Sequence, residues 1–187
     1  MTLPTAISLC CGAGVAADGI AKHLQTVFAV DIGKKALETH QLNHPGVPTI
    51  CGDISDPAIL RQARGRVRSV DVIIAAPPCQ DFANCKSASA SERISSGRSA
   101  LYVEVINWVA EYMPSAYIAE NVPGVRKSWQ FHAAIARLRR LGYRVTLFDI
   151  DAADFGTPQH RERVFSLQFG ATCRFRNAPR LRMATTR

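Results

Sequence analysis

The sequence lacks the long apolar stretches that mark membrane proteins. None of its apolar runs approaches the roughly 20 residues that a transmembrane helix requires. Its first residues, Met1-Thr2-Leu3-Pro4, show no basic segment followed by an apolar one, which is the pattern of a secretion signal. With 47% apolar and 20% charged residues, the chain has the composition of a globular domain. We therefore expect one domain that is cytoplasmic and has no membrane partner.

Paired cysteines and metal-ligand spacings are also lacking. The six cysteines include no C-x-x-C pair, so we expect reduced thiols rather than disulfides. The cysteines and the five histidines do not fall at the usual spacings of zinc ligands, and no metal is expected. His40 and His44 are four residues apart but lack the glutamate of a zinc-peptidase helix. We interpret this pair as part of a solvated helix face.

Acidic residues are scarce, and the last part of the chain has none. The net charge is +8, and no Asp or Glu follows Glu162. Basic side chains release counterions from phosphates, so this balance favours a polyanionic partner such as nucleic acid. We divide the chain into a domain over residues 1–170 and a basic tail over 171–187. The basic residues that carry this expectation are Arg174, Arg176, Arg180, Arg182 and Arg187 in the tail, and Arg61, Arg64, Arg66 and Arg68 in a second cluster.

Short β-branched runs alternate with segments of helical periodicity, which predicts an α/β fold. The alternation favours a mostly parallel, seven-stranded sheet with helices on both faces. The last two strands are separated only by the loop 150–162, so we expect an antiparallel last strand. The predicted strands are 5–9, 26–31, 47–50, 70–75, 116–119, 143–149 and 163–168, and the predicted helices are 16–24, 34–43, 55–66, 99–113 and 129–141.

A glycine-rich turn follows the first predicted strand. Gly12 and Gly14 permit a tight turn and a close backbone approach to a ligand. Asp31 lies 19 positions after Gly12, at the end of the second strand, where a carboxylate can accept hydrogen bonds from ribose hydroxyls. Asp53, after the third strand, could accept from an adenine amino group. The pattern also fits a nicotinamide-dependent dehydrogenase, so it predicts a nucleotide site without fixing the reaction.

A cysteine braced by two prolines follows the fourth predicted strand, in the stretch "APPCQDF". Only a thiolate attacks, and Cys79 could be activated by nearby arginines or a helix N-terminus. Glu120 ends the next predicted strand, so both side chains should reach the same rim of the sheet, where Glu120 could donate a proton. The polar segment 84–98, "NCKSASASERISSGR", is predicted to be a mobile loop that closes beside the thiol.

These motifs resemble, in the same order, those of DNA (cytosine-5)-methyltransferases over nearly all of residues 5–170. The stretch "SLCCGAG" resembles the S-adenosylmethionine loop of that family, and "PPCQDF" resembles its nucleophile motif. The stretches "ENV" and "QHRER" resemble its glutamate and Q-x-R-x-R motifs. The resemblance implies a Rossmann-like S-adenosylmethionine-dependent methyltransferase fold, S-adenosyl-L-methionine as cofactor, and DNA as substrate.

The resemblance also implies a role for individual residues. Cys79 would attack C6 of a flipped cytosine, while Glu120 would hold or protonate N3 and accept from the exocyclic amine. Arg161 and Arg163 would steady the base, its phosphate or the nucleophile loop. The implied cofactor-binding residues are Cys10, Gly12, Ala13, Gly14, Asp31, Ile32, Asp53, Ile54, Pro78 and Leu101, and the implied substrate-binding residues are Pro78, Gln80, Asn121, Val122 and Gln159.

The sequence departs from the family pattern in three places. Ser8 and Cys10 stand where the family has an aspartate and an aromatic residue, and Val15 replaces a frequent glycine. Ala83 replaces a serine after the nucleophile, and Ser96 an aspartate. After the Q-x-R-x-R segment we find no target-recognition region. We therefore expect an enzyme with low sequence specificity, or the catalytic part of a split enzyme completed by a second protein chain.

Two alternatives remain open at this point. The chain could be a non-catalytic module that binds nucleic acid or stimulates a partner, given the altered glycine loop. It could also methylate cytosine in RNA or in a free nucleotide. A dehydrogenase ranks last, because no site for hydride transfer is apparent.

Overall fold

A computed structural model describes residues 2–78 and 97–170 of the chain, with the side chains of 97–100 excepted. Cys79, Gln80 and the predicted loop up to residue 96 lie outside the described residues, as does the basic tail 171–187. Gly97 and Arg98, predicted to end that loop, are instead the first residues of a helix.

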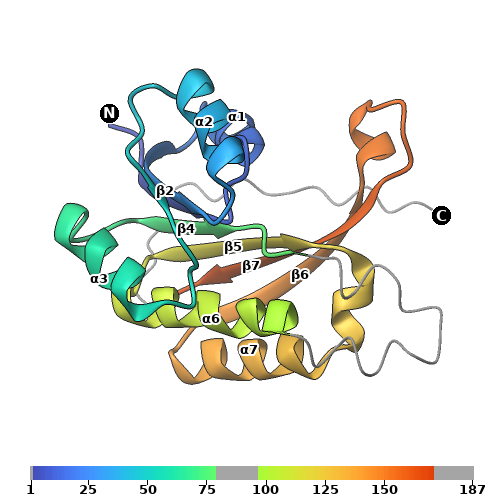
Figure 1. The fold of residues 1–187 in the computed structure, drawn as a ribbon. Helices are drawn as coiled ribbons and strands as arrows, with labels where there is room; N and C mark the ends of the chain where they lie inside the picture. Colours follow the sequence, from blue (N-terminus) through green and yellow to red (C-terminus); the bar gives the residue numbers. More distant parts are fainter. Residues whose placement is uncertain (1, 79–96, 171–187) are drawn as a thin grey trace.

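The described residues form one seven-stranded sheet of order β3-β2-β1-β4-β5-β7-β6, which confirms the predicted fold (Figure 1). Strands β1 to β5 pair in parallel, whereas β7 runs antiparallel to both β5 and β6. The last strand in sequence is thus inserted between its two predecessors. The strands are β1 (Thr5–Leu9), β2 (Gln25–Asp31), β3 (Thr49–Cys51), β4 (Val72–Ala75), β5 (Ala116–Asn121), β6 (Arg144–Asp151) and β7 (Glu162–Phe169).

The helices occupy both faces of the sheet, as Figure 1 shows. Three of them, α3, α6 and α7, lie together along one face, while α1 and α2 lie at the β2 end of the other (Figure 1). Two helix starts are capped in the usual way, because Asp56 accepts from Ala58 N and Ser128 accepts from Phe131 N. The helical elements are α1 (Val15–Ile20), α2 (Lys34–Asn43), α3 (Pro57–Arg66), α6 (Gly97–Tyr112), η1 (Pro123–Lys127), α7 (Trp129–Arg140) and η2 (Ala152–Phe155).

The main core lies between the sheet and the helices α6 and α7. Trp108 and Tyr117 are among its largest fully buried side chains. Trp108 Nε1 donates to the carbonyl oxygen of Ile54 at 2.9 Å, so a buried aromatic ring of α6 also anchors the turn after β3. This contact connects the buried core to the loop at the carboxyl end of β3.

The opposite face of the sheet is less completely covered. Ile118 is opposite Leu167 in the register of β5 and β7, and Glu120 is opposite Phe165. Because facing residues in a strand pair share one side of the sheet, these four side chains line the same face. All four remain partly exposed, in contrast to the buried neighbours Tyr117 and Ala119 on the other side.

The structure shortens two predicted elements. Helix α1 ends at Ile20 rather than at residue 24, just after Gly19, a poor helix former. Strand β3 begins after Pro48, whose ring nitrogen cannot donate to a ladder. Within residues 2–78 and 97–170, no helix is long and apolar enough to span a bilayer.

Candidate active site

The glycine-rich loop between β1 and α1 is held in place by Asp31. Its backbone has positive φ at Cys10 (52°), Gly12 (53°) and Gly14 (97°). One oxygen of Asp31 accepts from Gly12 N and the other accepts from Gly33 N, each at 2.8 Å. The carboxylate that was predicted to bind ribose therefore also ties the loop after β1 to the loop after β2.

Two polar side chains of the α2 end hold the same loop from outside. Asn43 Nδ2 donates to Ala13 O at 3.2 Å, and His44 Nε2 lies 3.2 Å from Gly14 O and 3.3 Å from an oxygen of Asp18. His40 is fully buried, and its ring centroid is 4.8 Å from that of His44. The interpretation of His40 and His44 as a solvated helix face is thus wrong, because both rings pack beneath the glycine loop.

Two adjoining cavities open at the carboxyl ends of the parallel strands. The first, here called the aspartate cavity, has a volume of about 170 Å³. Several residues predicted to bind the cofactor line it together, although they come from five separate segments of the chain. Its lining residues are Cys10, Asp31, Ile32, Gly52, Asp53, Ile54, Ala76, Pro78 and Leu101.

The polar groups of the aspartate cavity fit a nucleoside. Asp53 Oδ1 accepts from Ser55 N and Oγ, each at 2.8 Å, which orients its carboxylate. Ile32 is 70% exposed at the edge of this cavity, so it can cover a planar ring. Two oriented carboxylates beside apolar side chains are suited to hydroxyl and amino donors on an otherwise apolar surface.

The second cavity, here called the glutamate cavity, has a volume of about 610 Å³. Gly12 and Ala13 of the glycine loop line it, and Glu120 and Arg161 line it as well. Cys10 and Ala76 border both cavities, so the two hollows are neighbours. Gly14 lies at the start of α1 and supports the loop rather than lining either cavity.

The two cysteines of the glycine loop are poor nucleophiles. Burial, together with the nearby charge of Asp31, raises the pKa of both Cys10 and Cys11 to about 12. Both thiols are therefore neutral near pH 7 and serve as small lining groups. A reactive thiol, if the site uses one, has to come from elsewhere in the chain.

The exit of β5 is tied directly to the exit of β4. Asn121 is 2% exposed, and its Nδ2 donates to Pro77 O at 3.1 Å while its Oδ1 accepts from Val122 N at 2.9 Å. Pro77 is two residues before Cys79 in the sequence. This buried amide therefore ties the backbone at Pro77, after β4, to the end of β5.

An ion pair orients Glu120. Arg163 Nε lies 2.6 Å from Glu120 Oε1, and the two side chains are 19% and 32% exposed. A third hollow, here called the arginine hollow, has a volume of about 550 Å³ and contains Gln159, Arg161 and Arg163 together with His160. Val122 is half-buried after β5. Among the described residues, no cluster of His, Cys, Asp or Glu is arranged to hold a metal ion.

The Arg61–Arg68 cluster lies away from these cavities. Arg61, Arg64 and Arg66 belong to α3, and Arg68 lies between α3 and β4. Arg64 Nε is 3.0 Å from Glu111 Oε1, and its guanidinium lies 4.8 Å from the ring centroid of Tyr112. At least Arg64 therefore has a role in the fold besides any contact with a polyanion.

Several residues that support the site are not marked by any motif in the sequence. Trp108, Asn43 and His44 contact the backbone of site segments that lie at least 30 residues away in the sequence, and Asp151 contacts the backbone of Arg161 across the turn between β6 and β7. The one signal in the sequence is that Asn43 and His44 are polar and lie at the end of a predicted helix, where their side chains could bond to a neighbouring loop.

An open sheet of this order with ligand-sized cavities at its strand ends defines the class as a Rossmann-like S-adenosylmethionine-dependent methyltransferase fold. A solved protein encoded within a prophage of E. coli has a similar structure, with a TM-score of 0.72 and 27% identity, covering 90% of this chain and 47% of that one. The family model for C-5 cytosine-specific DNA methylases matches residues 5–179. The chain therefore belongs to the C-5 cytosine-specific DNA methylase family.

Curated relatives agree with this assignment. The chain is 35% identical over 172 residues to the Type II methyltransferase M.AgeI of Thalassovita gelatinovora, covering 88% of this chain and 39% of that protein. It is 32% identical over 187 residues to the Type II methyltransferase M.AquIA of Picosynechococcus, covering 90% of this chain and 74% of that protein. The chain thus spans less than half the length of M.AgeI and about three quarters of M.AquIA.

Proposed function

We propose that the protein transfers a methyl group to C5 of cytosine in DNA through a covalent bond between Cys79 and C6. The observation that carries this proposal is the hydrogen bond from Asn121 to Pro77 O. It supports placing the segment that enters Cys79 at the same rim as Glu120, which borders the glutamate cavity. Membership of the family supplies the reaction class.

The residues of the aspartate cavity would hold S-adenosyl-L-methionine. Asp31 would accept from ribose hydroxyls with lone pairs that remain beside its two backbone contacts, and Asp53 would accept from the adenine amino group. Ile32, Ile54 and Leu101 would enclose the purine ring. When bound, this cofactor supplies an electrophilic methyl group.

The chain's own residues then carry the chemistry on the base. The Cys79 thiolate forms a bond to C6 of a flipped cytosine, and the electron pair of the C5–C6 double bond moves to C5. Glu120, oriented by Arg163, binds the N3 and amino edge of the base and offsets the charge that develops there. After C5 is methylated, loss of its proton returns an electron pair to the ring, and the S–C6 bond breaks to release the thiolate.

We further propose that the enzyme has little intrinsic sequence specificity or is the catalytic part of a split enzyme. One observation supports a covering element on the sheet. The face of the sheet that carries Ile118, Phe165 and Leu167 is partly exposed beside α1. Apolar side chains on an open sheet face favour an apolar helix or loop as a covering element.

A methyl-transfer assay tests both levels of the proposal. The protein is incubated with labelled S-adenosylmethionine and, separately, duplex DNA, RNA or cytosine nucleotide, alone or with the products of neighbouring genes. Label at C5 of DNA cytosine supports the function, and label that requires a second protein supports the split enzyme. Transfer only to RNA or nucleotide replaces the substrate, whereas no transfer under any condition contradicts the function.

A further inference from the structure

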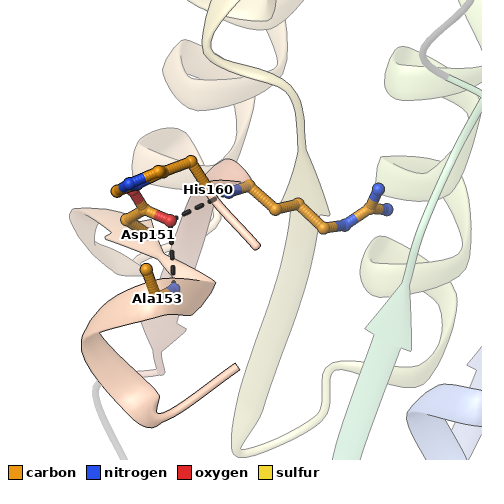
Figure 2. Close-up of polar contacts among 4 residues, drawn as sticks. Asp151, Ala153 and His160 are labelled. Carbon is orange, nitrogen blue, oxygen red and sulfur yellow. Dashed lines mark hydrogen bonds and ion pairs between the residues drawn. The ribbon is translucent and has the colours of Figure 1, made fainter. Parts of the chain in front are cut away.

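The hairpin between β6 and β7 is organised around one carboxylate, that of Asp151. Its Oδ1 accepts from Arg161 N at 2.8 Å and from Ala153 N at 3.1 Å, and its Oδ2 lies 2.9 Å from His160 Nδ1. Figure 2 shows Asp151 between Ala153 at the start of the turn and His160 at its end. The two sides of the hairpin are therefore joined through this side chain rather than through the strand ladder alone.

Arg161 is the residue whose backbone this arrangement fixes most completely. Its N–H donates to Asp151 Oδ1, and its carbonyl oxygen accepts from Ala152 N at 3.1 Å. Its side chain borders both the glutamate cavity, together with Glu120, and the arginine hollow. Because the backbone direction at a residue sets the path that its side chain can take, the Asp151 contacts determine where the guanidinium can reach.

We propose that Asp151 and His160 are positioning residues that act through Arg161, holding its guanidinium at the glutamate cavity when His160 is protonated. This inference rests on the proposed function, since Arg161 is the group that would meet the flipped base or its phosphate. Neither positioning residue needs to touch the substrate. The pair also makes the placement of Arg161 dependent on pH.

The charges around the pair set the direction of that dependence. The hydrogen bond from His160, with those from Arg161 N and Ala153 N, lowers the pKa of Asp151 to about 2. The same hydrogen bond raises the pKa of His160 above its usual 6.5, and the nearby charges of Asp154 and Glu162 act in the same direction. The positively charged side chains that share the hollow with His160 are Arg161 and Arg163.

The sign of the effect follows from the directions of these two pKa shifts. Asp151 stays ionised over the whole range in which the enzyme can be assayed. His160 is a cation below its raised pKa, so its contact with Asp151 is strongest there and weakens as the pH rises through that value. Ordering of Arg161 should therefore decline on the alkaline side of the His160 titration.

The test compares Asp151→Asn with the wild-type protein and with Asp149→Asn. The asparagine keeps the shape and one acceptor oxygen but loses the charge, whereas Asp149 ion-pairs with Arg126 instead and provides a matched control on the same strand. We expect kcat to fall about tenfold in Asp151→Asn through misplacement of Arg161, with the KM for S-adenosylmethionine unchanged. When Arg161 is already replaced by alanine, Asp151→Asn should lower kcat by less than about twofold.

Two further measurements separate positioning from general damage to the fold. In His160→Lys, the added charge does not titrate near neutrality, so activity should persist at alkaline pH and the ratio of variant to wild-type rates should rise as the pH increases. By NMR, hydrogen exchange at the Arg161 amide should be slow in the wild type and at least about tenfold faster in Asp151→Asn. The inference is overturned if Asp151→Asn shows the hydrogen exchange and the kinetics of the wild type. It is also overturned if Asp151→Asn lowers kcat equally with and without the Arg161 side chain.

The outcome remains decisive if the proposed function fails. A wild-type protein that transfers no methyl group contradicts the function, but the Arg161 amide exchange and the His160 titration still show whether Asp151 holds Arg161. A fully active wild type with unchanged Asp151→Asn behaviour contradicts only the positioning role.

Discussion

The contact between Asn121 and Pro77 allows a sharp prediction, because a nearly isosteric substitution replaces its hydrogen-bond donor with an acceptor. Asn121→Asp keeps the Oδ1 acceptor for Val122 N but replaces the donor that faces Pro77 O at 3.1 Å with a second oxygen. A buried hydrogen bond contributes about 1 kcal/mol, and leaving its partner unsatisfied costs about 1–3 kcal/mol more. We therefore expect the free energy of unfolding to fall by about 2–4 kcal/mol.

The same change should misplace the segment that leads into Cys79. If only about 1.4 kcal/mol of the loss falls on that segment, its competent arrangement becomes roughly tenfold less populated. The assays are urea unfolding and the rate of covalent trapping on DNA that contains 5-fluorocytosine, measured with S-adenosylmethionine present. Asn107→Asp on α6 is the control: it also loses an amide donor, here to Glu104, while it keeps the acceptor for Arg137. Because Asn107 lines none of the three cavities, this variant should lose stability without slower trapping. Unchanged stability combined with a weaker affinity for DNA would refute the reasoning, since Asn121 would then serve the substrate instead of Pro77.

Three further predictions concern the support of the cofactor cavity. Gly14→Ala should weaken S-adenosylmethionine binding in calorimetry, because the new Cβ would lie 2.6 Å from the His44 ring at a φ of 97°; an unchanged Kd would contradict the packing. Trp108→Phe should lower the free energy of unfolding by about 2 kcal/mol and Tm by roughly 4–8 °C through loss of the bond to Ile54 O; an unaltered Tm would argue against that bond. Burial lowers the pKa of His40, while an unfolded histidine takes up a proton near pH 6.5. The free energy of unfolding should therefore decline from pH 7 to 5, and His40→Leu should flatten this decline. An equally steep pH profile in the variant would exclude His40 as the source of the decline.

The sheet was predictable from the sequence because its central strands are buried on both sides. Strand β4 is a short continuous run of apolar residues, and the buried part of β1 is interrupted only by Ser8; their buried positions in the structure account for that pattern. The antiparallel pairing of the last two strands followed from the short connection between them. The insertion of β7 between β5 and β6 did not, because strand order depends on contacts between distant segments that no local pattern records.

The site was predictable only where residue chemistry and strand ends coincide. Asp31, Asp53 and Glu120 were identified because each follows an apolar strand, and the structure places them around adjoining cavities. The histidines of α2 were misjudged, since a helix rich in polar residues gives no sign that it packs beneath a glycine loop. Asp151 escaped notice for a similar reason, because His160 Nδ1 and Arg161 N reach its carboxylate from the far side of a turn.

The central claim is that the Cys79 sulfur bonds to C6 of a cytosine in DNA. Mass spectrometry of the protein after incubation with S-adenosylmethionine and a duplex containing 5-fluorocytosine tests it most directly. We predict a stable adduct on the peptide that contains Cys79, lost in Cys79→Ala and retained in Cys85→Ser. An adduct that persists without the Cys79 thiol, or methylation of unmodified cytosine by the Cys79→Ala protein, would contradict the account.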